Sequence, residues 1–81
     1  MVEIFVMDFP EFAPIVQDAR RQGYQVEGPG EGLWSISAPS ELRFNRKETG
    51  LSAALWNTVL GPGVDGRVTK FDRFEFTVSE A

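Results

Sequence analysis

Residues 1–8 read MVEIFVMD, and their alternation predicts a first strand over about residues 2–8. Successive side chains of a strand point to opposite faces, so one face carries the small branched residues and the other carries Phe5 and Met7. Both faces of this strand are therefore apolar. Such a strand is typical of the centre of a sheet that is covered on both sides, or on one side by a partner subunit.

The segment that follows has the periodicity of a helix. Asp8 and Pro10 interrupt the chain, and Pro14 is tolerated only in the first turn of a helix, where its missing amide hydrogen has no partner. The helix is expected to begin near residue 11 or later and to end at Gly23. The stripe expected to face the core contains Phe12, Ile15, Val16 and Ala19, and the side expected to face away contains Gln17, Asp18 and Arg21.

A hairpin is the simplest interpretation of residues 24–38. Tyr24 and Val26 begin a short strand that leads into residues 28–32, GPGEG, a composition rich in turn formers. Residues 33–38, LWSISA, then alternate with the period of a half-buried strand.

The segment after Pro39 allows two interpretations. Leu42 and Phe44 lie two residues apart, which favours a strand that presents the intervening basic side chains to solvent or to a ligand. The alternative is a helix with Ser40 as its N-cap and Gly50 as its end, but the apolar spacing fits a helical stripe poorly.

Thr49 is expected to cap a second helix over about residues 50–60. Its inner stripe would contain Leu51, Ala54, Leu55 and Val59, with Trp56 on the flank. After turns at residues 61–63 and 65–66, a terminal strand or strand pair is expected, with a β-bulge near residues 70–72. Its inward side chains would be Val68, Phe74, Phe76 and Val78.

Together these segments predict one α+β domain over residues 1–81. The order β-α-β-β-(β)-α-β indicates a ferredoxin-like two-layer sandwich, with a mixed or antiparallel sheet and two helices on one face. The second sheet face would lack cover within the chain and expose Phe5, Met7 or their neighbours. Because contiguous apolar patches mark interfaces, we expect a homodimer through that face, although the last strands or the glycine-rich loop could instead fold over it.

Composition excludes several classes of chemistry. The 81 residues contain no Cys and no His, which excludes disulfides, thiolate metal sites and cysteine nucleophiles and removes the commonest transition-metal ligand. We expect neither a metal nor a cofactor. A net charge of −4 makes nucleic acid an improbable partner. Residues 1–10 lack a basic segment, and acidic residues interrupt their apolar positions, so the sequence predicts neither a signal peptide nor a membrane span. We therefore expect a cytoplasmic location.

Basic side chains cluster in one short stretch. Arg43, Arg46 and Lys47 run into Thr49 and Gly50, at what we expect to be the N-terminus of the second helix. Free amide hydrogens and the positive end of a helix dipole favour an anion there. The stretch is a candidate site for a phosphate or a carboxylate, although a solvated strand end explains the same residues and no phosphate-loop or dinucleotide motif is present.

Two tryptophans are candidates for contact with a partner or ligand. Trp34 follows the glycine-rich loop and Trp56 falls off the main stripe of its helix. Burial in the core explains Trp34 equally well and Trp56 slightly better. Three pairs of nearby carboxylates have no diagnostic spacing, so no catalytic residue is assigned.

The sequence favours a non-enzymatic binding or accessory domain that contacts a protein partner or a small anionic ligand. The alternative is a small oligomeric isomerase or lyase acting on a hydrophobic carboxylic acid. That enzyme would need a carboxylate in an apolar pocket within reach of Arg43 or Arg46.

Overall fold

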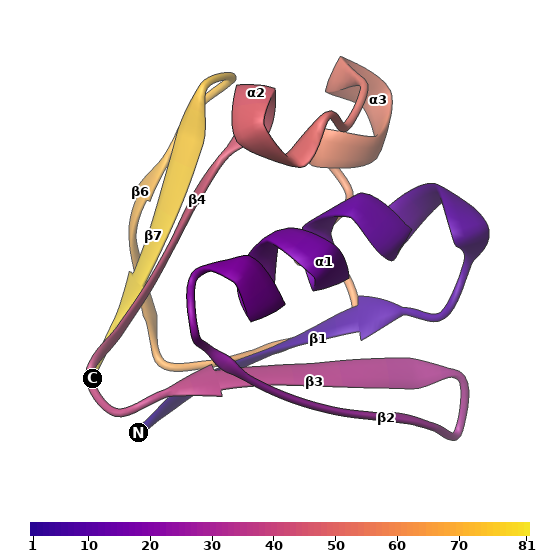
Figure 1. The fold of residues 1–81 in the computed structure, drawn as a ribbon. Helices are drawn as coiled ribbons and strands as arrows, with labels where there is room; N and C mark the ends of the chain where they lie inside the picture. Colours follow the sequence, from indigo (N-terminus) through magenta and orange to yellow (C-terminus); the bar gives the residue numbers. More distant parts are fainter.

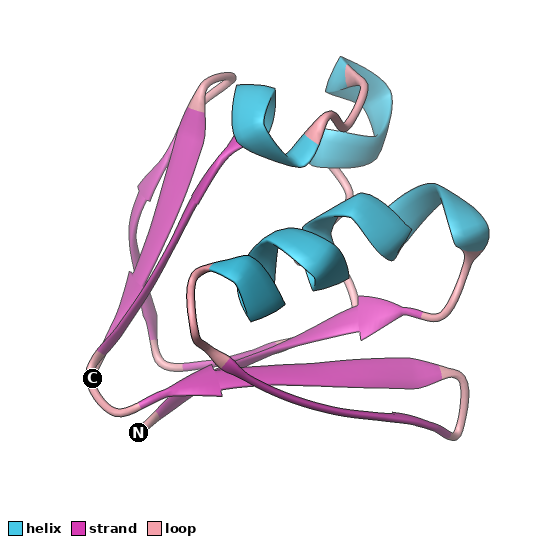
Figure 2. Cartoon of the chain, viewed as in Figure 1, coloured by secondary structure: helices cyan, strands magenta, loops and turns pink.

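The computed structural model describes all of residues 1–81 and shows an α+β fold with two antiparallel sheets and short helices (Figures 1 and 2). The strands are β1 (Val2–Met7), β2 (Gln25–Gly30), β3 (Leu33–Ala38), β4 (Glu41–Asn45), β5 (Val64–Asp65), β6 (Arg67–Phe71) and β7 (Glu75–Ser79). The helices are the 3₁₀ turn η1 (Pro10–Phe12), α1 (Ala13–Arg21), α2 (Arg46–Thr49) and α3 (Ala53–Trp56).

The first strand lies inside a four-stranded sheet with the order β2-β3-β1-β5, which confirms its predicted interior place. It pairs with β3 so that Ile4 lies opposite Ile36 and Phe5 lies opposite Ser35. The Ile4 side of the sheet is buried and faces α1 (Figure 1). The predicted hairpin of β2 and β3 is also confirmed. Its turn is Glu31-Gly32, and both residues have positive φ, as a type I′ turn requires.

The ferredoxin-like arrangement is not confirmed, because the strands do not form one sheet. Strands β4, β7 and β6 form a separate three-stranded sheet set at an angle to the first, and the helices lie between the two sheets (Figure 1). The chain crosses between the sheets at Pro39-Ser40 and at Gly66. At Gly66, φ is 143° and a Cβ atom would lie 2.9 Å from the carbonyl oxygen of Ser79, so only glycine fits this corner.

Helix α1 ends as predicted. The amide of Gly23 donates to the carbonyl of Arg20 and that of Tyr24 to the carbonyl of Ala19, the bonding pattern of a Schellman motif. The expectation that Asp18 faces away from the core is wrong, since its side chain is 2% exposed and binds Arg21 and Gln22. These partners supply the hydrogen bonds that a buried carboxylate needs. None of the helices combines the length and the apolarity needed to cross a membrane.

The helix expected over residues 50–60 is instead two single turns. Gly50 has the left-handed φ of 73° and ends α2, whereas the side chain of Ser52 caps α3 by accepting from the amide of Leu55. Thr49, the expected N-cap, is the last residue of α2, and its buried hydroxyl donates to the carbonyl of Arg46. The N-cap of α2 is Asn45.

Breaking this helix changes which side chains enter the core. Trp56, expected on the flank, is fully buried, whereas Ala54 is exposed. The centre of the Trp56 ring lies 5.1 Å from that of Phe76, which in turn lies 5.2 Å from that of Phe44. The predicted burial of Phe76 and Val78 is confirmed, and Phe44 is buried as well.

The terminal segment is a strand pair with its turn at residues 72–74. The predicted bulge exists but lies earlier, where the β6–β7 register shifts between Val68 and Lys70. Val68 and Phe74, both expected to point inward, are 43% and 59% exposed. Val68 belongs to an edge strand, and Phe74 lies at the tip of the hairpin, so neither is covered by a neighbouring strand.

Candidate functional site

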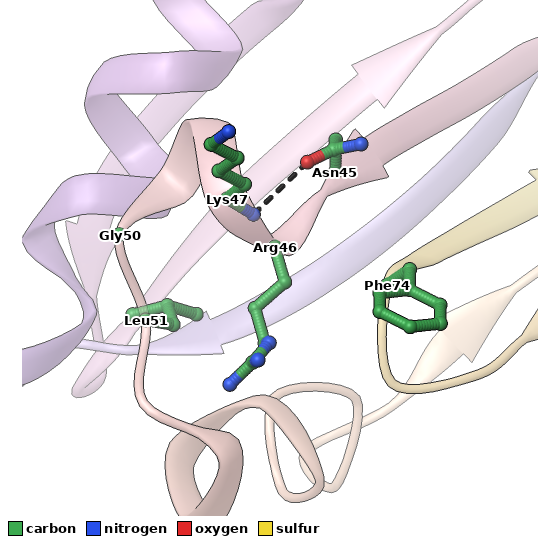
Figure 3. A pocket seen from close by; sticks show the side chains of 6 residues that line it. All are labelled: Asn45, Arg46, Lys47, Gly50, Leu51 and Phe74. Carbon is green, nitrogen blue, oxygen red and sulfur yellow. Dashed lines mark hydrogen bonds between the residues drawn. The ribbon is translucent and has the colours of Figure 1, made fainter.

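The most informative surface feature is a hollow of about 440 Å³ at the tip of the three-stranded sheet (Figure 3). It forms where β4 runs into α2 and meets the β6–β7 turn. The residues that line it are Asn45, Arg46, Lys47, Gly50, Leu51 and Phe74. The predicted anion-site residues Arg46, Lys47 and Gly50 are thus brought together.

Arg46 has the most distinctive environment in the hollow. Its side chain is half-buried and extends between the side chains of Leu51 and Phe74 (Figure 3). Every ion pair of the chain involves other residues, so no carboxylate lies within 4.0 Å of this guanidinium. A guanidinium without a counter-charge gains charge-assisted hydrogen bonds when it meets a carboxylate or a phosphate.

Lys47 adds positive charge from the other side of the same turn. Its side chain points away from that of Arg46 (Figure 3), and it too has no carboxylate partner. Arg73 contributes a third charge at the rim, with its guanidinium carbon 4.9 Å from the centre of the Phe74 ring. The hollow therefore combines apolar walls with uncompensated positive charge.

The wall that carries Phe74 is held in place by several hydrogen bonds. The carbonyl of Phe74 accepts a hydrogen bond from the amide of Arg46 at 2.8 Å, which fastens the β6–β7 turn to the start of α2. Two residues before Phe74, the carbonyl of Asp72 accepts a hydrogen bond from the indole N–H of Trp56 at 2.7 Å. These contacts fix the backbone on which the exposed Phe74 ring is mounted, so the hollow is largely preformed.

The carboxylate of Asp72 organises the turn itself. It accepts from the amides of Phe74 at 2.8 Å and Glu75 at 2.9 Å. Hydrogen bonds from the backbone of Glu75 and then of Phe74 hold the pKa of Asp72 below its ordinary value of 3.8. Nearby, the hydrogen bond to Glu75 and the charge of that carboxylate raise the pKa of Lys70 above 10.5.

A depressed carboxylate pKa makes this turn sensitive to acid. The carboxylate stabilises the folded turn above pH 3.8, and that contribution is lost as the pH falls through the lower folded pKa. We expect Asp72→Ala to speed amide exchange at Phe74 and Glu75 at pH 6, with Asp72→Asn closer to wild type because its amide oxygen still accepts. Hydrogen exchange by NMR measures this. A carboxyl titration midpoint for Asp72 at or above 3.8 would contradict the assignment.

The other residues of the predicted anion site lie elsewhere. Arg43 projects from β4 into a neighbouring polar hollow and pairs with Glu41 at 3.5 Å. That hollow is charge-balanced, because Arg21 pairs with both Asp18 and Glu48. Thr49 is buried, and the expected helix N-terminus at Thr49-Gly50 is wrong because Gly50 ends α2 instead of beginning a helix. A one-turn helix also has too small a dipole for the electrostatic argument.

The predicted interface residues differ in exposure. The prediction of Trp56 as an interface residue is wrong, because its side chain is fully buried. Trp34 is half-buried; its indole N–H donates to Asp8 at 3.1 Å, and the guanidinium carbon of Arg20 lies 5.3 Å from the ring centre. On the outward side of β1, Phe5 is half-buried and Met7 is 41% exposed.

Phe74 is the residue of the hollow whose role sequence reasoning missed, since it was expected in the core. A signal was present: Asp at the start of a turn binds backbone amides two and three residues on, which places Phe74 within the turn and not in a strand. No group of three or more acidic side chains is arranged to hold a metal ion.

Neither the models of protein families nor the curated proteins contain a match to this chain. The physical properties of the hollow are therefore the guide to function.

Proposed function

We propose that this protein is a small binding domain whose ligand is an amphipathic anion, a carboxylate or phosphate ester attached to an apolar group. The observation that carries the proposal is the half-buried side chain of Arg46, which has no acidic partner and extends between Leu51 and Phe74. The anionic group would meet Arg46, and the apolar group would lie against the Phe74 ring.

The chemistry of the lining supports binding over the alternative of an isomerase or lyase. Proton transfer on a carboxylic acid needs a general base close to the bound substrate. The lining residues of the hollow supply cations, an amide and apolar side chains. The buried carboxylate of Asp18 lies in the neighbouring polar hollow, where Arg21 and Gln22 hold it.

Replacing Arg46 with glutamine tests the proposal. With phenyl phosphate and benzoate as probes, we expect amide shifts at residues 45–51 and 73–75 of the wild-type chain in an NMR titration. Arg46→Gln should weaken binding about tenfold or more, because charge-assisted hydrogen bonds contribute about 1.5–3 kcal/mol. Benzyl alcohol, which has the ring without the charge, should bind far more weakly.

Arg43→Gln is the matched control, since Arg43 lies in β4, three residues before Arg46, and is already paired with Glu41. It should leave the affinity for both probes unchanged. Equal losses in the two variants would show that the ligand responds to overall charge and not to the hollow, and an absence of shifts at these amides would reject the site.

A further inference from the structure

The outward face of the four-stranded sheet has no helix over it (Figure 1). The register of the strands defines which side chains share this face, because directly opposed residues point to the same side. They are Glu3, Phe5 and Met7 of β1, Leu33, Ser35 and Ser37 of β3, Gln25 and Glu27 of β2, and Asp65 of β5. The set combines acidic and apolar residues and contains no Lys or Arg.

Part of this face is hollowed. Phe5 and Leu33, both half-buried, line a hollow of about 340 Å³ together with Glu27 and Glu31. Glu31 belongs to the β2–β3 turn, where it adds an acidic group at the rim. An apolar floor with a carboxylate rim has the chemistry to hold a side chain that is apolar along its stem and positively charged at its end.

The carboxylates of this face are not neutralised within the chain. The ion pairs of the protein use the carboxylates of Asp18, Glu41, Glu48, Asp72, Glu75 and Glu80. Glu3, Glu27, Glu31 and Asp65 take part in none of them, although Glu3 accepts a hydrogen bond from Ser35 and Glu27 accepts one from Gln25. The uncompensated negative charge therefore gathers around the apolar side chains of one surface.

We propose that this face docks a segment of another protein that carries Lys or Arg beside apolar side chains. Its cations meet Glu27 and Glu31, and an apolar side chain enters the hollow over Phe5. Complementary charge of this kind directs association and selects the partner. A second copy of this chain is a poorer occupant, because pairing the same face would place carboxylates opposite carboxylates.

A short synthetic peptide in which Lys alternates with Val is a direct probe. In an NMR titration, the amides of Phe5, Glu27, Glu31 and Leu33 are expected to shift. Peptides in which Glu replaces Lys, or Ser replaces Val, should not move them. Raising the salt concentration should weaken binding, because exposed charge pairs are screened.

The double variant Glu27→Gln/Glu31→Gln should bind the Lys-Val peptide about three- to tenfold more weakly, as expected for the loss of two exposed ion pairs. The double variant Glu11→Gln/Glu48→Gln is the matched control, because it removes the same two charges from exposed carboxylates of η1 and α2, away from this face. Its affinity should equal that of the wild type.

Three results would overturn the proposal. Shifts confined to other residues would place the peptide elsewhere, and an equal loss in the Glu11→Gln/Glu48→Gln control would reduce the effect to net charge. A concentration-dependent dimer in sedimentation, whose interface contains the amides of Phe5 and Leu33, would assign the face to self-association instead.

Discussion

Replacing Trp56 with alanine is expected to lower the free energy of unfolding by about 3–5 kcal/mol. The indole is fully buried, packs against Phe76 and Phe71, and donates to the carbonyl of Asp72. A domain of this length is expected to have a total stability of only about 4–12 kcal/mol, so the variant loses a large part of it. Urea denaturation followed by far-ultraviolet circular dichroism measures the change.

Two further variants separate the contributions. Trp56→Phe keeps most of the packing but leaves the Asp72 carbonyl without its donor, which should cost about 1–3 kcal/mol. Trp34→Ala, at a half-buried position, should cost less than Trp56→Ala. Equal destabilisation by Trp34→Ala and Trp56→Ala would contradict the burial on which the prediction depends.

Substitution of Gly66 with alanine should have an effect of similar size. A Cβ atom there would lie 2.9 Å from the carbonyl oxygen of Ser79, 3.0 Å from Val78 and 3.2 Å from Val2, and the φ of 143° is itself unfavourable for alanine. The clash involves backbone and two core side chains, so relief requires the corner between the sheets to open. We expect a loss of about 3 kcal/mol or more, measured by urea denaturation.

Other glycines provide a graded control for this prediction. Gly23 has φ of 87° but open space around its Cβ position, so Gly23→Ala should cost only about 1 kcal/mol. Gly30 has open space and no positive φ, and Gly30→Ala should change stability by less than about 0.5 kcal/mol. If Gly66→Ala were no worse than Gly23→Ala, the close packing at the corner would be disproved.

The two proposed surfaces place opposite charges on separate parts of the molecule. Unpaired cations gather around Arg46 at the tip of the three-stranded sheet, and unpaired carboxylates gather around Phe5 on the four-stranded sheet. A net charge of −4 conceals this separation, because it sums both surfaces. A domain with one surface for a small anion and another for a basic segment would suit an accessory role, in which ligand and partner are held at the same time.

Local pattern was a good guide wherever a segment's structure depends on its own residues. Alternation located β1 and β3, helical spacing and Gly23 located α1, and the glycine-rich stretch located the hairpin. Pattern failed over residues 50–60. The spacing of apolar residues there fits a helix, but Gly50 and Ser52 end one turn and begin another, and tertiary packing then draws Trp56 into the core.

The residues of the candidate site also fall into those that the sequence could predict and those that it could not. Arg46 and Lys47 could be named from the clustering of basic residues, because that clustering is a property of adjacent positions. Phe74 could not, since it reaches the hollow only through the β6–β7 turn and the hydrogen bond from its carbonyl to the amide of Arg46. Arg43 lies only three residues before Arg46 but projects into a different hollow, because β4 ends at Asn45 and α2 begins at Arg46.

The sequence by itself determined an α+β domain, most of its strands, its first helix and the stretch that carries its free cations. These features follow from the conformational preferences and periodicity of neighbouring residues. Only the tertiary structure decided that the strands divide into two sheets at Pro39-Ser40 and Gly66, that Trp56 is buried, and that Phe74 faces Arg46 across a hollow. Those outcomes depend on contacts between segments far apart in the chain, whose energies no local pattern contains.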